Sequence, residues 1–252
     1  MVRFVTVCDL RTTLSSPRSV AALFQGRAPR FLSRVVGRNA SGWVLLLWTL
    51  LVLYPHPVLL IVSVQRAWSP VVDPGAVHDL AAALPDDPRA IEAFVNTMLV
   101  PYAVPWQTYG VPWFFPTPRE VLARGAGDCQ ARAVILASIL RAKGIPATFT
   151  GSFDHLWVTY PGKQATQLEQ IAVAIAAQQT DGTYRFTRPH VVDWKASWAI
   201  EKAYFWDAMP AWRFRLLLSG WLAIGLLRRH GRVIGHSPED TAPNATQTMT
   251  GV

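Results

Sequence analysis

Residues 118–160 constrain the possible folds and functions of this 252-residue chain more than any other stretch. They contain a cysteine at a predicted helix start and a histidine at a predicted strand start. Gly127-Asp128-Cys129 precedes an apolar, helix-forming stretch that Gly144 ends, and Asp128 is a typical N-cap residue. His155 opens the strand-like run His155-Leu156-Trp157-Val158. A helix N-terminus favours a thiolate and a nearby imidazole can accept the thiol proton, so the stretch predicts a Cys129 of lowered pKa that acts as a nucleophile.

The elements around this stretch predict an α+β fold in which the Cys129 helix is packed on a small antiparallel sheet. The apolar spacing is helical before and after Asp87-Pro88, and Pro161-Gly162 and Asp181-Gly182 are turn signals between short strand-like runs. The expected elements are helices over 76–84, 87–99 and 128–143, a packed proline-rich loop over 101–118, and strands over 146–150, 155–160 and from about residue 167.

A third side chain is expected to orient the His155 imidazole and to stabilise its cation. Glu169 is the favoured candidate, because an antiparallel strand starting near residue 167 would bring it level with His155. Asp181 and Asp193 are the alternatives.

The charge distribution indicates a membrane rather than nucleic acid as the partner. The net charge of +8 lies in the flanks, since residues 1–64 carry +6, residues 65–205 carry 0 and residues 206–252 carry +2. A nucleic-acid binder would be expected to carry its basic residues on the folded domain. Here seven arginines precede an apolar run, which is the pattern of a protein with a cytoplasmic N-terminus.

Two apolar runs are candidate membrane segments. Residues 43–64 are long enough to cross a bilayer and predict an uncleaved anchor that is kinked at Pro55 and Pro57; the alternatives are a buried core helix or two short pieces broken at Pro55-His56-Pro57. Residues 216–227 are short, and are expected to form either a second span or an interfacial or buried helix. The expected domains are a basic cytoplasmic arm (1–41), a transmembrane anchor (42–64), a folded domain (66–207), a second transmembrane or interfacial helix (208–230) and a disordered tail (231–252).

Metal and cofactor chemistry is not expected. The six histidines have no ligand spacing, and the two cysteines, Cys8 and Cys129, form no Cys-x-x-Cys pair. Both thiols are expected to be free, and Cys8 is assigned no catalytic role.

The combination of Gly127-Asp128-Cys129, Gly144-Ile145-Pro146-Ala147 and His155-Leu156-Trp157-Val158 resembles the core signature of the transglutaminase-like superfamily. The resemblance covers roughly residues 87–190. It implies a papain-like core in which Cys129 is the nucleophile and His155 the base. The family's third residue is usually Asp, and Glu169 stands at the matching place here.

That resemblance implies acyl transfer through a Cys129 thioester on a peptide or amide carbonyl, ending in hydrolysis or amine transfer. With the apolar runs, it predicts a membrane-tethered cysteine peptidase, amidase or acyltransferase in the bacterial inner membrane, with its domain on the periplasmic side and a protein or peptide as substrate. The alternative is a catalytically silent binding or assembly protein that keeps the fold.

Overall fold

The computed structural model describes residues 30–190 and 192–234. The chain divides into two compact units, residues 1–44 and residues 45–252. The elements follow in the order α1 (Arg30–Leu53), α2 (Val58–Trp68), η2 (Gly75–Val77), α3 (His78–Ala83), α4 (Pro88–Phe94), η3 (Val95–Leu99), α5 (Pro105–Thr108), α6 (Pro118–Arg124), α7 (Cys129–Ala142), β1 (Thr148–Gly151), β2 (Leu156–Thr159), η4 (Gln167–Glu169), η5 (Ile171–Val173), β3 (Ala176–Gln178), β4 (Tyr184–Phe186), α8 (Trp194–Glu201), η6 (Lys202–Asp207) and α9 (Ala211–Ile234).

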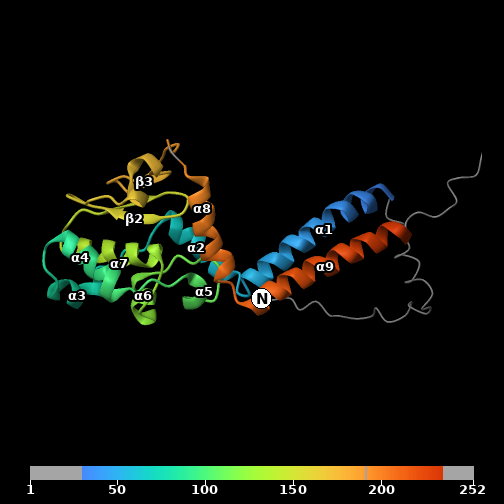
Figure 1. The fold of residues 1–252 in the computed structure, drawn as a ribbon, viewed down its shortest axis with the longest axis horizontal. Helices are drawn as coiled ribbons and strands as arrows, with labels where there is room; N and C mark the ends of the chain where they lie inside the picture. Colours follow the sequence, from blue (N-terminus) through green and yellow to red (C-terminus); the bar gives the residue numbers. More distant parts are fainter. Residues whose placement is uncertain (1–29, 191, 235–252) are drawn as a thin grey trace, which may run out of the picture. The chain divides into compact units, whose positions relative to one another are not determined.

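Helix α7 lies at the centre of the core and matches the helix predicted over 128–143. All of its residues from Ala131 to Leu140 are buried except Arg132. A helix that is apolar all round must be covered on every side, and α7 contacts α3, α4, α6 and the strands β1 and β2. Figure 1 shows these helices beneath the strands. The fold is therefore of α+β class, as predicted.

The sheet has four antiparallel strands in the order β2-β1-β3-β4. Strands β1 and β2 form a hairpin in the register Phe149↔Val158 and Thr150↔Trp157, close to the predicted ranges. The third strand differs from the expectation, because residues 167–173 form two 3₁₀ turns, η4 and η5, and β3 begins only at Ala176. Since β1 lies between β2 and β3, the strand that follows η5 pairs with β1 and not with β2.

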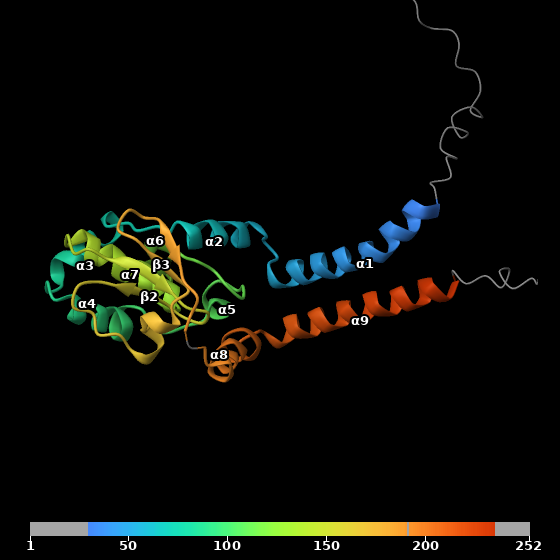
Figure 2. The same cartoon turned by 90° about the horizontal axis from the view of Figure 1, so that it is seen from above.

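The apolar run 43–64 forms two helices and not the single kinked helix that was expected. Helix α1 ends at Leu53 and α2 begins at Val58, with an angle of 82° between Gly42–Leu53 and Val58–Trp68. Pro55 and Pro57 lack the amide donors that a continuous helix needs, so the helix is interrupted between α1 and α2. Figure 2 shows this interruption. The alternative of two short pieces at Pro55-His56-Pro57 matches the fold. Among the described residues no helix alone is long and apolar enough to cross a membrane, and only this bent pair passes on length and composition.

Helix α9 contains the second apolar run and extends beyond it at both ends. Near its start, Arg213 Nη1 donates to the carbonyl of Leu53 at 3.2 Å, which satisfies a carbonyl at the end of α1. Trp221 Nε1 donates to Thr49 Oγ1 at 2.9 Å. Residues 30–41 of the predicted arm and 231–234 of the predicted tail are helical, whereas the rest of both, including Cys8, lies outside the described residues.

Candidate active site

Cys129 is the first residue of α7, and its position is fixed by the two residues before it. Asp128 caps the helix, because its Oδ1 accepts a hydrogen bond from the Ala131 amide at 3.1 Å. A Cβ added at Gly127 would lie 2.2 Å from the Cβ of Ala131, so only glycine fits at the closest approach of this loop to the helix. The Gly127-Asp128-Cys129 sequence therefore fixes where the helix begins and where the sulfur lies.

His155 is the residue immediately before β2, at the tight connection from β1. Its backbone amide donates to Ser152 Oγ at 3.2 Å, and the Ser152 amide donates to the His155 carbonyl at 2.8 Å. The imidazole is stacked on the Trp157 ring at 5.9 Å between centroids. Helix α7 and strand β2 are in contact, and the amide of the next residue, Leu156, is close enough to the Cys129 sulfur to favour its thiolate, so the histidine segment and the cysteine are neighbours.

Glu169 lies beside His155, although not by the predicted route. It is on η4 and not on a strand, and Glu169 Oε1 lies 3.8 Å from His155 Nε2. Its other oxygen accepts hydrogen bonds from the amide and the hydroxyl of Thr166. Burial alone would raise the pKa of Glu169, but the neighbouring His155 imidazole, the hydrogen bonds from Thr166 and the charge of Lys163 outweigh it and lower the pKa to about 2.

The two alternatives to Glu169 have other structural roles. Asp181 is exposed at a turn, where its Oδ1 accepts from the amide and the hydroxyl of Thr183. Asp193 caps α8 by accepting from the amides of Lys195 and Ala196. Of the three carboxylates considered, only Glu169 lies within ion-pairing distance of His155 among the described residues.

The expectation of a lowered thiol pKa is wrong for the protein without substrate. Burial raises the pKa of Cys129 to about 12, and the negative charge of the neighbouring Asp128 adds to this. The nearby backbone amides of Leu156 and Gln130 act in the opposite direction, but their effect on the pKa is weaker. The backbone amides at the helix N-terminus therefore do not stabilise a thiolate enough by themselves, so the thiol needs a base that removes its proton.

Cys129 and His155 together line two cavities. The larger has a volume of about 640 Å³ and mainly apolar and aromatic walls, among them Tyr102, Trp113, Phe149 and Phe205. The smaller, about 90 Å³, is bordered by polar side chains and includes Glu169. Only the large cavity has room for a substrate of several non-hydrogen atoms.

Tyr204 and Lys163 also contact the site, although no sequence pattern identifies them. Tyr204 on η6 donates to Asp128 Oδ2 at 2.6 Å, and Lys163 Nζ lies 3.2 Å from Glu169 Oε1. Neither belongs to a recognisable motif. Lys163 follows the predicted Pro161-Gly162 turn, which was the one local signal that it turns back towards the strand of His155.

Within residues 30–190 and 192–234, no three His, Cys, Asp or Glu side chains are grouped to hold a metal ion. Comparisons with protein-family models, with curated proteins and with solved structures found no match to the chain.

Proposed function

We propose that the protein is a membrane-tethered, transglutaminase-like cysteine acyl-transfer enzyme with a papain-like core. In this proposal Cys129 is the nucleophile, His155 the general base and Glu169 the residue that orients the imidazole. The observation that carries it is that Cys129 and His155 line the same two cavities while Glu169 Oε1 lies 3.8 Å from His155 Nε2. A nucleophile, a base and an orienting carboxylate are the parts that covalent catalysis requires.

The first step would be transfer of the thiol proton to His155. Glu169 is paired with Nε2, so Nδ1 is the ring nitrogen left for this proton. The sulfur attacks the carbonyl carbon, and backbone amides at the start of α7 stabilise the oxyanion. The intermediate then collapses: the carbon–nitrogen bond breaks, His155 returns the proton to the departing amine, and a thioester remains on Cys129. Water or a second amine, deprotonated by His155, resolves the thioester.

The large cavity favours a substrate with apolar groups next to the reacting carbonyl. Besides His155, its charged wall residues are Asp154 and Glu201, both acidic, and no lysine or arginine of the described chain lines it. Aromatic walls gain free energy by covering apolar surface, and the two carboxylates would repel an acidic substrate. The expected substrate is therefore a peptide or amide with an apolar, non-acidic acyl group.

Large exposed apolar side chains support attachment to a membrane. They lie on the described part of α1 within the second unit (Leu46, Leu47, Leu50, Leu51) and on α9 (Leu218, Leu222, Leu226, Leu227). Residues this apolar are seldom left in water over so many helical turns. The proposed location is the bacterial inner membrane, with the α+β domain on the periplasmic side. Retention of the chain in membranes after alkaline carbonate washing tests the attachment; its release would contradict it.

A burst experiment tests the acyl-transfer proposal. The full chain in detergent, with Cys8→Ser, is mixed with N-acetyl-phenylalanine p-nitrophenyl ester, an activated acyl donor with an apolar group. The expected result is a burst of nitrophenolate near one equivalent and an acetyl-phenylalanyl adduct on Cys129. Cys129→Ala should abolish both, and the corresponding aspartate ester should react more slowly.

The second candidate, a catalytically silent binding protein, is favoured by the raised pKa of Cys129. It predicts neither burst nor adduct, with the apolar ester bound reversibly at most.

A further inference from the structure

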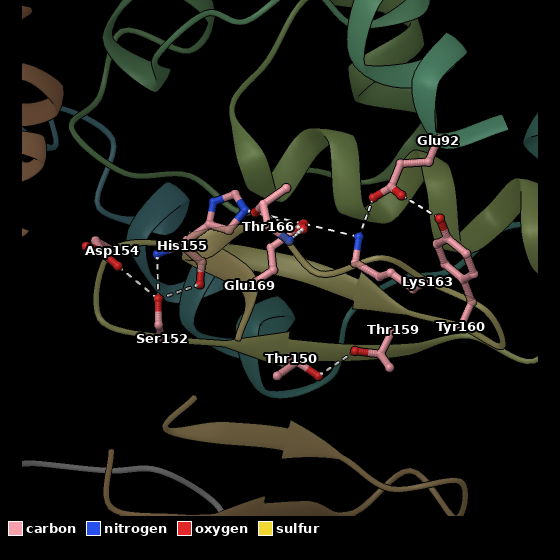
Figure 3. A network of polar contacts seen from close by, with 10 residues as sticks. All are labelled: Glu92, Thr150, Ser152, Asp154, His155, Thr159, Tyr160, Lys163, Thr166 and Glu169. Carbon is pink, nitrogen blue, oxygen red and sulfur yellow. Dashed lines mark hydrogen bonds and ion pairs between the residues drawn. The ribbon is translucent and has the colours of Figure 1, made fainter. Parts of the chain in front are cut away.

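Lys163 places a buried ammonium group between two carboxylates. Its side chain is only 6% exposed, and Nζ lies 3.2 Å from Glu169 Oε1 while also forming an ion pair with Glu92 Oε1. The second oxygen of Glu92 accepts a hydrogen bond from the Tyr160 hydroxyl. Figure 3 shows the chain of contacts from Tyr160 through Glu92 and Lys163 to Glu169 and His155. Burying three charges is costly in free energy, so such a network is weak support for stability alone.

The same oxygen of Glu169 faces both Lys163 and His155. Oε1 is 3.2 Å from Lys163 Nζ and 3.8 Å from His155 Nε2. The ammonium of Lys163 therefore holds the Glu169 carboxylate beside the imidazole and also partly neutralises the negative charge of that carboxylate. Glu92 opposes this effect, because it neutralises Lys163 from the other side.

Lys143 shows what a purely structural lysine looks like in the same domain. Its side chain is 11% exposed, and its ammonium group binds the Leu84 carbonyl and Asp86. Neither partner lines either cavity or contacts His155. Lys163 differs because its partner, Glu169, is the carboxylate paired with the imidazole.

Other charged or titratable side chains face the network from several elements. On α4, Arg89 donates to the Gly162 carbonyl, one residue before Lys163. The remaining groups around the two cavities are Tyr102, Asp128, Cys129, Arg132, Asp154, Tyr184, Glu201 and Tyr204. None of these forms an ion pair with Lys163 or Glu169 among the described residues, so Glu92 is the counter-charge of Lys163.

We propose that Lys163 is a positioning residue for the Cys129–His155–Glu169 site, and that Lys163 and Glu92 together set how strongly Glu169 attracts the proton on His155. This inference rests on the proposed function for its catalytic meaning, although its physical content is independent of the substrate. Wild-type Glu92, Lys163 and Glu169 carry a net charge of −1. Lys163→Met makes it −2, Glu92→Gln makes it 0, and the double variant restores −1.

The test is the titration of His155 followed by NMR, using the full chain in detergent with isotopically labelled histidine. The His155 resonance is assigned by its loss in His155→Gln. Lys163→Met should move the His155 midpoint to higher pH, and Glu92→Gln should move it to lower pH. Each shift should be about one pH unit, the size expected when one nearby charge is removed in a partly buried site. The double variant should return it to near the wild-type midpoint. Lys163→Arg, which keeps the charge, should stay close to wild type and controls for a packing defect in Lys163→Met.

Opposite shifts that cancel in the double variant would support the inference, since a merely structural lysine gives no such sign pattern. Shifts of the same sign, or none, in variants that keep the wild-type fold by circular dichroism would overturn it. The ester burst separates the two proposals. A burst without opposite shifts would contradict only the role of Lys163, whereas opposite shifts without a burst would contradict only the acyl-transfer proposal.

Discussion

Tyr204 donates a hydrogen bond to the buried carboxylate of Asp128, with 2.6 Å between the hydroxyl and Oδ2. The two residues are 76 positions apart, and Asp128 is the N-cap of the helix that begins at Cys129. The segment that leads to α9 is thereby tied to the start of the nucleophile helix. Burial raises the pKa of Asp128, and the Tyr204 hydroxyl is the main group that opposes this rise.

Tyr204→Phe should therefore destabilise the fold by about 1–3 kcal/mol, because it leaves a buried carboxylate with one partner fewer. Thermal or urea unfolding of the full chain in detergent measures the change. Tyr184→Phe is the matched control, since Tyr184 lines the same cavity and its hydroxyl has no hydrogen-bond partner within residues 30–190 and 192–234. Equal stability of the two variants would show that the Tyr204–Asp128 bond contributes nothing.

Gly127→Ala should also destabilise the protein, by about 1–3 kcal/mol or more, because the added methyl group would overlap the Ala131 side chain. Relief of this overlap must displace the loop before Cys129. The rate of Cys129 alkylation should therefore change together with the midpoint of thermal or urea unfolding. Gly225→Ala is a control in which a Cβ meets nothing within 4 Å. A Gly127→Ala variant as stable as wild type would mean that the loop is not tightly fitted to α7.

Glu169→Gln should lower stability in a pH-dependent way. The pKa of Glu169 is about 2 in the folded chain against an ordinary value of 4.5. A lowered pKa stabilises the fold above the ordinary value, and that contribution disappears as the pH falls from about 4.5 to about 2. The difference from wild type should be roughly 2–3 kcal/mol near pH 6 and should shrink towards pH 2. A difference that is constant across this range would contradict the assigned ionisation.

Much of this fold could be predicted because its signals are local. The Asp128 cap, the apolar run of α7 and the Pro161-Gly162 turn determine neighbouring backbone, and the observed helix and the β1–β2 hairpin lie close to the expected ranges. The structure of the run 43–64 was harder to predict, since its apolar composition fits one long helix while Pro55 and Pro57 fit a break. The prolines predicted the break better than the composition did, because apolar side chains cannot replace the backbone N–H that proline lacks.

The candidate site was predictable only in part, because its outer members depend on tertiary contacts. Glu169 was identified through an expected strand, yet it reaches His155 from a 3₁₀ turn held by Thr166. Lys163 and Tyr204 carry no local pattern that points to Cys129. The raised pKa of Cys129 was missed for the same reason, since burial of α7 by other elements outweighs the helix N-terminus.

The most direct test of the account is the pH dependence of Cys129 alkylation by iodoacetamide, in the full chain with Cys8→Ser. The thiol alone should be inert at neutral pH, given a pKa of about 12, so any reactivity there must come through His155. We expect measurable alkylation at pH 6–7. The rate should fall at least about 100-fold in His155→Ala and should be unchanged in His78→Ala, which alters an exposed histidine. Equal rates in wild type and His155→Ala would contradict it.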